Sequence, residues 1–284
     1  MKLRLLTALV LIPPLALLIG WSPQSASAQQ LHELLYLAVV IAIVERSYYE
    51  YLRLSRQAGW EAMGAAGYAS AALLCVGQYI EVQCTAVPGV FILSAAVLVL
   101  LAVPAAGLRG ARDFAHFFAR SASTVFGAFY VGFLLSFLLP LRFTELEAGR
   151  RVTYFLFFVI YFGDFCAFAV GRTLGRRPLA PRVSPRKTLE GAVAGLLGSL
   201  LVAWLFQRWF WQTSGLKTVM LVAAWVALVG QIGDLVESGL KRAARVKDSG
   251  SLLPGHGGLL DRIDSILFGA PALWLAMAVA ALWR

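Results

Sequence analysis

Apolar residues form nine long runs along this chain, and short polar segments separate them. The runs cover approximately residues 5–21, 31–45, 62–80, 88–106, 119–140, 152–171, 189–207, 218–236 and 265–283. A helix needs about 20 apolar residues to cross a hydrocarbon layer about 30 Å thick. Since the backbone of a lipid-embedded segment must satisfy its own hydrogen bonds, the pattern predicts an all-α, polytopic integral membrane protein with about nine transmembrane helices.

The composition agrees with this class. Of the 284 residues, 60% are hydrophobic and 14% are charged, whereas about 25% of a typical soluble domain is charged. The three cysteines, Cys75, Cys84 and Cys166, have no metal-ligand spacing, and their odd number argues against a disulfide framework. The net charge of +10 lies mostly in the short polar segments. It therefore indicates membrane topology, and we expect no nucleic-acid partner.

The basic residues predict an orientation for the spans. With the N-terminus in the cytoplasm, 19 of the 25 lysines and arginines fall on the cytoplasmic side. The other six are Arg142, Arg150, Arg151, Arg208, Lys217 and Arg284. Cytoplasmic loops carry an excess of lysine and arginine. We therefore expect a cytoplasmic N-terminus and two cytoplasmic polar segments, 172–190 and 238–264.

The N-terminal segment allows two interpretations. Lys2 and Arg4, an apolar run and Ala26-Ser27-Ala28 together resemble a secretory signal with a cleavage site. The apolar run of about 17 residues is longer than the usual signal core, which favours a retained first helix. Cleavage would leave every later span in the same orientation, so the charge pattern does not decide between the two.

Two aspartates lie inside apolar runs. Asp164 follows Tyr161-Phe-Gly, and Asp234 follows Gly230-Gln-Ile-Gly. An ionised carboxylate at membrane depth is costly, so it normally faces a partner or a water-filled cavity. A structural hydrogen bond between helices is the alternative, and it stays open for Asp164.

Further spacing connects Asp234 with the second polar segment. Asp234, Ser238 and Lys241 are spaced i, i+4, i+7 and form one stripe on a helix. Asp261 and Asp264 are spaced i, i+3 and share a face at the start of the last run. Three carboxylates could thus converge near the membrane surface. Such hard oxygen ligands suit Mg²⁺, which usually also takes substrate phosphates and waters.

The cations nearby are more numerous than three carboxylates need, so they predict an anionic ligand. They are Lys187, Lys241, Arg242, Lys247 and Arg262. A solvated positive-inside loop is the alternative, and it accounts for Arg245. Gly257 and Gly258 precede a probable helix start, where backbone N–H groups can approach a phosphate. The ring of His256 could orient a phosphate or carry a proton, and a hydrogen bond within the turn is an equal alternative.

The first polar segment cannot form a continuous helix, because prolines stand at positions 178, 181 and 185. Lys187, beside the next helix start, is placed to hold a phosphate as a point charge. Ser184 or Thr188 could instead cap that helix, with Glu190 in its first turn.

Two motifs carry a resemblance to a known family. The longer reads Ser238-x-x-Lys241-Arg242-x4-Lys247-Asp248-x5-Pro254-x-His256-Gly257-Gly258-x-x-Asp261-Arg262-x-Asp264. It resembles the signature of the phosphatidate cytidylyltransferases, or CDP-diacylglycerol synthases. Ser184-Pro-Arg-Lys187-Thr188-x-Glu190-Gly191 resembles a second block of that family, with Arg186 where lysine is frequent. The first third of the chain resembles the family only in hydropathy and in its Arg-Leu-Leu-Thr-Ala-Leu start.

The resemblance implies a Mg²⁺-dependent reaction in which CTP and phosphatidate give CDP-diacylglycerol and pyrophosphate; a second or monovalent cation stays open. It assigns metal binding to Asp234, Asp261 and Asp264, and catalysis to these last two with Lys241 and Ser238. Substrate binding falls to Ser184, Lys187, Thr188, Glu190, Arg242, Lys247, Asp248, His256, Gly257, Gly258 and Arg262. Residues 119–284 would form the catalytic region, and 1–118 lipid-facing or dimerisation helices. A homodimer in a bacterial inner membrane, with its site facing the cytoplasm, is also implied.

Three other functions are alternatives. A CDP-alcohol phosphatidyltransferase should show Asp-x-x-Asp-Gly-x-x-Ala-Arg, and Ser265-Ile follows Asp264 here, so this class is rejected. A CTP-dependent polyprenol-type kinase would use similar ligands but release CDP. A non-enzymatic transporter of anionic lipids would need the basic loops but not the three aspartates.

Overall fold

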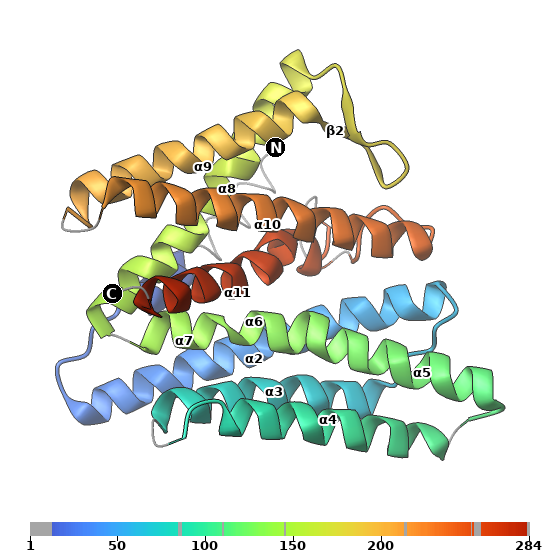
Figure 1. The fold of residues 1–284 in the computed structure, drawn as a ribbon. Helices are drawn as coiled ribbons and strands as arrows, with labels where there is room; N and C mark the ends of the chain where they lie inside the picture. Colours follow the sequence, from blue (N-terminus) through green and yellow to red (C-terminus); the bar gives the residue numbers. More distant parts are fainter. Residues whose placement is uncertain are drawn as a thin grey trace.

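The computed structural model describes residues 13–84, 87–109, 111–144, 146–212, 215–250, 252 and 257–282. Figure 1 shows a bundle of long helices with one β-hairpin at its edge. The helices are α2 (Ala26–Gln57), α3 (Gly64–Gln83), α4 (Val90–Leu108), α5 (Phe114–Gly127), the π-helix η1 (Ala128–Phe133), α6 (Leu134–Ser136), α7 (Leu138–Phe143), α8 (Leu146–Leu174), α9 (Leu189–Trp209), α10 (Leu216–Ala243) and α11 (Leu260–Leu282). The strands are β1 (Pro178–Ala180) and β2 (Ser184–Thr188).

The predicted all-α, polytopic class is confirmed. Among the described residues, seven helices are long and apolar enough to cross a membrane. Each predicted span from 31–45 onward overlaps one helix or a run of consecutive helices, but the span at 62–80 corresponds to α3, which is not one of the seven. The span at 5–21 lies partly outside the described residues, of which 13–20 are helical. The count of nine spans therefore stays a prediction.

The helices run side by side in two groups, with α11 between them. In Figure 1, α9 and α10 lie above α11 and α2 to α7 lie below it, while α8 rises from beside α7 to the hairpin. The C-terminal ends of α2, α8 and α10 share one end of the bundle with the N-terminal ends of α9 and α11. We call this the hairpin end, because the β-hairpin lies there too. The basic segments 172–190 and 238–250 are both at this end, as the charge pattern requires.

The hairpin replaces a helix where the prolines stand. Its strands are antiparallel, with Pro178 opposite Thr188 and Ala180 opposite Ser184. Thr188 then caps α9, because its hydroxyl accepts the backbone N–H of Gly191 at 3.2 Å. Glu190 accepts the N–H groups of Arg176 and Arg177 at 3.0 and 3.2 Å, which fastens the chain before β1 to the start of α9. The capping alternative for Thr188 is thus what the structure shows.

Small residues allow α8 and α9 to pack closely. A side chain at Gly191 would bring its Cβ to 2.8 Å from the carbonyl oxygen of Ala167 on α8. Ser199 on α9 donates its hydroxyl to the carbonyl of Val159 at 2.8 Å. Close backbone approach and hydroxyl bonds of this kind are typical of helix association in membranes. This packing holds the hairpin against the rest of the bundle.

The far end of the bundle secures the segment before α2. Arg142, only 1% exposed, donates to the carbonyls of Ile19 and Trp21 at 3.1 and 2.7 Å. Tyr154 donates its hydroxyl to the carbonyl of Ala16 at 2.7 Å. The sequence predicts Arg142 as a charge in a polar segment outside the cytoplasm. It is instead a buried residue of α7 that bonds to the C-terminal end of the helical turn before α2.

Candidate active site

Three carboxylates from two helices converge at the hairpin end. Asp234 and Glu237, one turn apart on α10, face Asp264 on α11, and one oxygen of each lies within 4.8 Å of the others. The two helices can approach here because position 233 is glycine: a Cβ at that position would lie 2.7 Å from the carbonyl oxygen of Asp264. Glu237 is fully buried, and its Oε1 has no hydrogen-bond partner among the described residues. We call Asp234, Glu237 and Asp264 the carboxylate cluster.

Two lysines form ion pairs with this cluster and its neighbour Asp261. Lys241 lies one turn after Glu237, pairs with it, and also donates to Asp261 at 2.8 Å. Lys187 of β2 pairs with Asp234. Asp234, the first member of the predicted stripe on α10, thus pairs with a lysine from the other polar segment. This ion pair joins the hairpin to the cluster.

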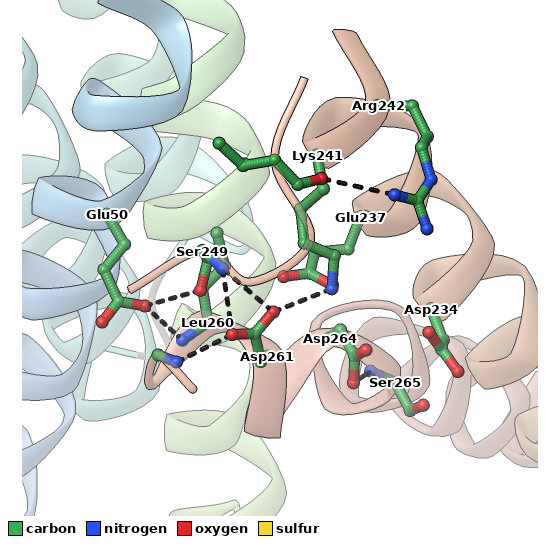
Figure 2. A network of polar contacts seen from close by, with 12 residues as sticks. Glu50, Asp234, Glu237, Lys241, Arg242, Ser249, Leu260, Asp261, Asp264 and Ser265 are labelled. Atoms are coloured by element: carbon green, nitrogen blue, oxygen red, sulfur yellow. Dashed lines mark hydrogen bonds and ion pairs between the residues drawn. The ribbon is translucent and has the colours of Figure 1, made fainter. Parts of the chain in front are cut away.

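Asp261 has a different environment from the cluster. Besides Lys241, its carboxylate accepts the backbone N–H of Ser249 at 3.0 Å and that of Gly258 at 2.7 Å. Figure 2 shows it between the loop that follows α10 and the start of α11. These donors occupy most of its acceptor positions, so Asp261 organises the loop and orients Lys241.

Glu50 of α2 holds the same loop from the opposite side (Figure 2). Its side chain is fully buried, and it accepts the N–H groups of Leu259 and Leu260 at 3.0 and 2.8 Å and the hydroxyl of Ser249 at 3.0 Å. Arg46, one turn earlier, pairs with it at 3.1 Å. Glu50 thus stabilises the start of α11, where carboxylates are favoured by the helix dipole.

Backbone conformation and close packing require glycine at two positions of the loop. Gly257 has a φ of +83°, which side-chain-bearing residues rarely adopt. A Cβ at Gly258 would overlap Glu50 and the hydroxyl of Ser249. The N–H of Gly258 donates to Asp261, so in this arrangement it serves the loop and not an incoming phosphate.

Asp164 lies on α8 next to the cluster. With Ser199, Gln231 and Ser265 it lines a cavity of about 10 Å³ between α8, α9, α10 and α11. That volume corresponds to about one water molecule. Asp164 is also within electrostatic range of Asp234. It thus borders a polar cavity as well as the cluster.

The other predicted site residues occupy varied positions. Ser238 is buried on α10, while Arg242 is exposed and donates to the carbonyl of Val183 in the hairpin at 3.1 Å. Lys247 and Asp248 are exposed in the loop after α10. His256 lies outside the described residues. Arg262 is exposed, Ser184 lies on β2, and Thr188 and Glu190 are engaged in holding the hairpin.

Sequence reasoning missed Glu237 and Glu50. Glu237 is spaced i, i+3 from Asp234 and i, i+4 before Lys241, so the helical stripe itself contained the signal. Glu50 stands in the same helix four residues after Arg46, and an acid–base pair next to an apolar run was the available clue. Its contacts with Leu259 and Leu260 have no counterpart in local sequence.

The donor set is compatible with a divalent cation. Five carboxylates (Asp164, Asp234, Glu237, Asp261 and Asp264) lie together, and two lysines form ion pairs with them. Uncompensated carboxylates in a membrane-embedded site are costly. Carboxylate oxygens are the ligands that Mg²⁺ prefers, completed by waters and phosphates.

Comparisons with known proteins give a consistent picture. A family model described as "Cytidylyltransferase family" matches residues 2–280. Among curated proteins, the phosphatidate cytidylyltransferase of Bacillus subtilis is 40% identical over 152 residues, which is 54% of this chain and 56% of the relative. Proteins of the same name from Staphylococcus epidermidis and Brucella suis are 44% identical over 125 and 159 residues. These alignments cover 44% and 55% of this chain and 48% and 57% of the relatives. The chain thus spans about half the length of the curated relatives it matches.

Proposed function

The chain belongs to the cytidylyltransferase family, and from this premise we propose that it transfers the cytidylyl group of CTP to phosphatidate. A phosphate oxygen of the lipid forms a bond to the α-phosphorus of CTP, the bond between the α- and β-phosphates breaks, and pyrophosphate leaves. The products are CDP-diacylglycerol and pyrophosphate. The relatives named phosphatidate cytidylyltransferase support this activity. The observation that carries it is the carboxylate cluster with its paired lysines, placed at the end of a membrane bundle.

Mg²⁺ is the proposed cofactor, with Asp234, Glu237 and Asp264 as its ligands. This set differs from the sequence expectation in one member, because Glu237 lies in the cluster while Asp261 is engaged by Lys241 and two backbone N–H groups. When bound, the ion supplies positive charge to phosphate oxygens during transfer. Positioning and charge neutralisation provide most of the catalysis in phosphoryl and nucleotidyl transfer.

The cations around the cluster are proposed to hold the two polyanionic substrates. Lys241 is fixed by Glu237 and Asp261 and, with Ser238 one turn earlier on α10, would hold a reacting phosphate. Lys187 enters from the hairpin. The remaining members are Arg242, Lys247, Arg262 and His256, which would share the CTP phosphates and the lipid head group.

The remaining roles are structural. Asp248 and Ser184 lie in the two segments that border the cluster, and Thr188 and Glu190 keep Lys187 in place through the hairpin. Asp261, Gly257 and Gly258 shape the loop that carries the cations. Such fixed groups lower the barrier because they need no rearrangement during the reaction.

The protein is proposed to be a multi-pass protein of a bacterial inner membrane with the hairpin end in the cytoplasm. The concentration of basic residues at this end supports the orientation. An anionic leaflet would also attract a basic site. A homodimer is proposed by family analogy alone.

The proposal is tested with purified full-length protein in detergent, supplied with phosphatidate, CTP and Mg²⁺. CDP-diacylglycerol that forms in an amount equal to the pyrophosphate released, and that disappears on chelation, supports it. Release of CDP instead would indicate the lipid kinase. Binding of anionic lipids without any turnover would indicate the transporter.

A further inference from the structure

Tyr130 has a buried hydroxyl that the described part of the fold leaves without a partner. The residue is 4% exposed, and its hydroxyl has no hydrogen-bond partner among the described residues. Buried polar groups are normally hydrogen-bonded, and an exception calls for an explanation. A buried donor without an acceptor is costly to the free protein, and a bound ligand that supplies an acceptor would remove that cost.

Three other tyrosines, two of them buried and Tyr154 half-buried, donate to backbone carbonyls. Tyr48 donates to the carbonyl of Met63 at 3.1 Å, and Tyr51 donates to the carbonyl of Ser123 at 2.6 Å. Tyr154 donates to the carbonyl of Ala16 at 2.7 Å. Backbone acceptors are therefore within reach of tyrosines elsewhere in this fold, and Tyr130 differs from these three.

The backbone around Tyr130 is also unusual. Residues Ala128–Phe133 form a π-helix within the long helical stretch that runs from α5 to α7. π-helical turns inside α-helices are rare and occur frequently at functional sites, because they change the direction of the side chains they carry. The local conformation and the unpartnered hydroxyl are independent observations, and they fall on the same residue.

Tyr130 is connected to the helices of the carboxylate cluster through Phe268 of α11. Its ring stacks on Phe126, with centroids 5.4 Å apart, and meets the ring of Phe268 edge-on at 6.3 Å. Phe268 is one helical turn after Asp264, and its side chain packs against Gly233, the residue before Asp234. The phenol is within electrostatic range of all three cluster carboxylates. Through Phe268, Tyr130 is therefore one side-chain contact away from the crossing of α10 and α11 that carries the cluster, whereas Lys187 pairs with Asp234 from the hairpin.

We propose that Tyr130 is a substrate-binding residue whose hydroxyl donates a hydrogen bond to a phosphate oxygen at the carboxylate cluster. This inference rests on the proposed function, because both CTP and phosphatidate bring phosphate oxygens to that place. No cluster carboxylate accepts the hydroxyl in the protein alone, although three are within electrostatic range. A phosphate drawn to the lysines and the metal supplies the missing acceptor, and a bond to an anionic oxygen is stronger than one to a neutral group.

The test compares Tyr130→Phe with Tyr51→Phe in the full-length protein. Tyr130→Phe removes a donor that has no partner among the described residues of the free protein, so Tm stays unchanged or rises, while kcat/KM falls roughly 10- to 100-fold. Tyr51→Phe removes a satisfied bond to Ser123, so Tm falls while kcat/KM remains near wild type. A higher KM for CTP identifies the nucleotide phosphates as the acceptor. A higher KM for phosphatidate identifies the lipid phosphate, and a lower kcat with unchanged KM values identifies the phosphate in the transition state.

Two results would overturn the proposal. One is wild-type kcat/KM for both substrates in Tyr130→Phe. The other is a parallel fall of Tm and activity, as expected of a purely structural residue. If the wild-type protein made no CDP-diacylglycerol, the proposed function would fail separately, and the rise in Tm on adding CTP and Mg²⁺, or phosphatidate and Mg²⁺, would then test Tyr130. A smaller rise in Tyr130→Phe supports the proposal; an equal rise, or none in the wild type, refutes it.

Discussion

Glu50 accepts the backbone N–H of Leu260 at 2.8 Å, although 210 residues separate the two along the chain. The contact joins α2 to the first turn of α11, which carries Asp261 and Asp264. The first third of the chain has no site-specific motif, yet it supplies a buried carboxylate that holds the residues before and at the start of α11. The described part of residues 1–118 thus supplies a hydrogen-bond acceptor to the start of α11, while the lipid-facing or dimerisation role of this region stays a prediction.

Substitution of Glu50 tests this connection. Glu50→Gln keeps the shape of the side chain but weakens its bonds to Leu259 and Leu260 and removes the charge that pairs with Arg46. We expect a loss of about 1–3 kcal/mol in unfolding free energy and roughly a tenfold fall in kcat. Glu33→Gln is the matched control, because Glu33 accepts bonds from Gln29 and Gln83 away from the site. Equal turnover of Glu50→Gln and wild type would contradict a positioning role.

The metal assignment predicts different consequences for two neighbouring acids. Glu237→Gln removes a proposed ligand and should lower kcat at least about 100-fold, with weaker binding of Mn²⁺ measured by electron paramagnetic resonance. Asp261→Asn should also lower turnover severely, because it releases Lys241 and the loop, but Mn²⁺ binding should persist. Asp264→Asn should follow Glu237→Gln. Normal Mn²⁺ binding in Glu237→Gln together with lost binding in Asp261→Asn would contradict this assignment. The ligands would then be Asp234, Asp261 and Asp264, as the sequence predicts.

A comparison of Lys241 with Arg245 tests whether one specific cation or the total charge of the loop is needed for activity. Lys241 is mostly buried and pairs with Glu237 and Asp261, whereas Arg245 is exposed four residues later. Lys241→Ala should reduce kcat/KM at least about 100-fold, since it removes a fixed charge and leaves two acids without it. Arg245→Ala should change kcat/KM less than about threefold. Comparable losses in both variants would mean that the loop acts through its total charge.

Two glycines of the same motif region should respond in opposite directions. Gly258→Ala would force a methyl group into Glu50 and the hydroxyl of Ser249, so we expect lost activity and a lower Tm. Nothing lies within 4 Å of a Cβ at Gly239, inside α10. Gly239→Ala should therefore raise stability by about 0.5–1 kcal/mol without loss of activity. Thermal unfolding and turnover of both variants check this, and a neutral Gly258→Ala would contradict the described loop.

The N-terminal segment should be retained in the mature protein. Cleavage after Ala28 would remove the carbonyls of Ile19 and Trp21 that bond to the buried guanidinium of Arg142, and a buried charge that loses its acceptors is costly. Intact-mass analysis of the protein purified from membranes checks this. A mature chain that begins at Gln29 would contradict it.

Part of this arrangement follows from the sequence, because local pattern governs it. Apolar runs predict most of the long helices, and the prolines at 178, 181 and 185 predict the break that became the hairpin. Helical spacing also predicts that Asp234 lies on the same face of its helix as Lys241. These features depend on neighbours within a few residues.

The rest depends on how helices cross. Whether Glu237 or Asp261 completes the cluster is decided by the approach of α10 and α11 at Gly233, which no spacing within either helix specifies. Glu50 reaches Leu260 only after the two halves of the bundle meet. The π-helix at Tyr130 likewise has no signal in the apolar pattern of 119–140.

Cytidylyl transfer is tested by following two phosphorus labels of CTP in parallel reactions with phosphatidate and Mg²⁺. We expect the α-label to enter the lipid and the γ-label to leave as pyrophosphate, and we expect chelation to stop both. A γ-label in the lipid with the α-label in free CDP would contradict cytidylyl transfer and identify a kinase.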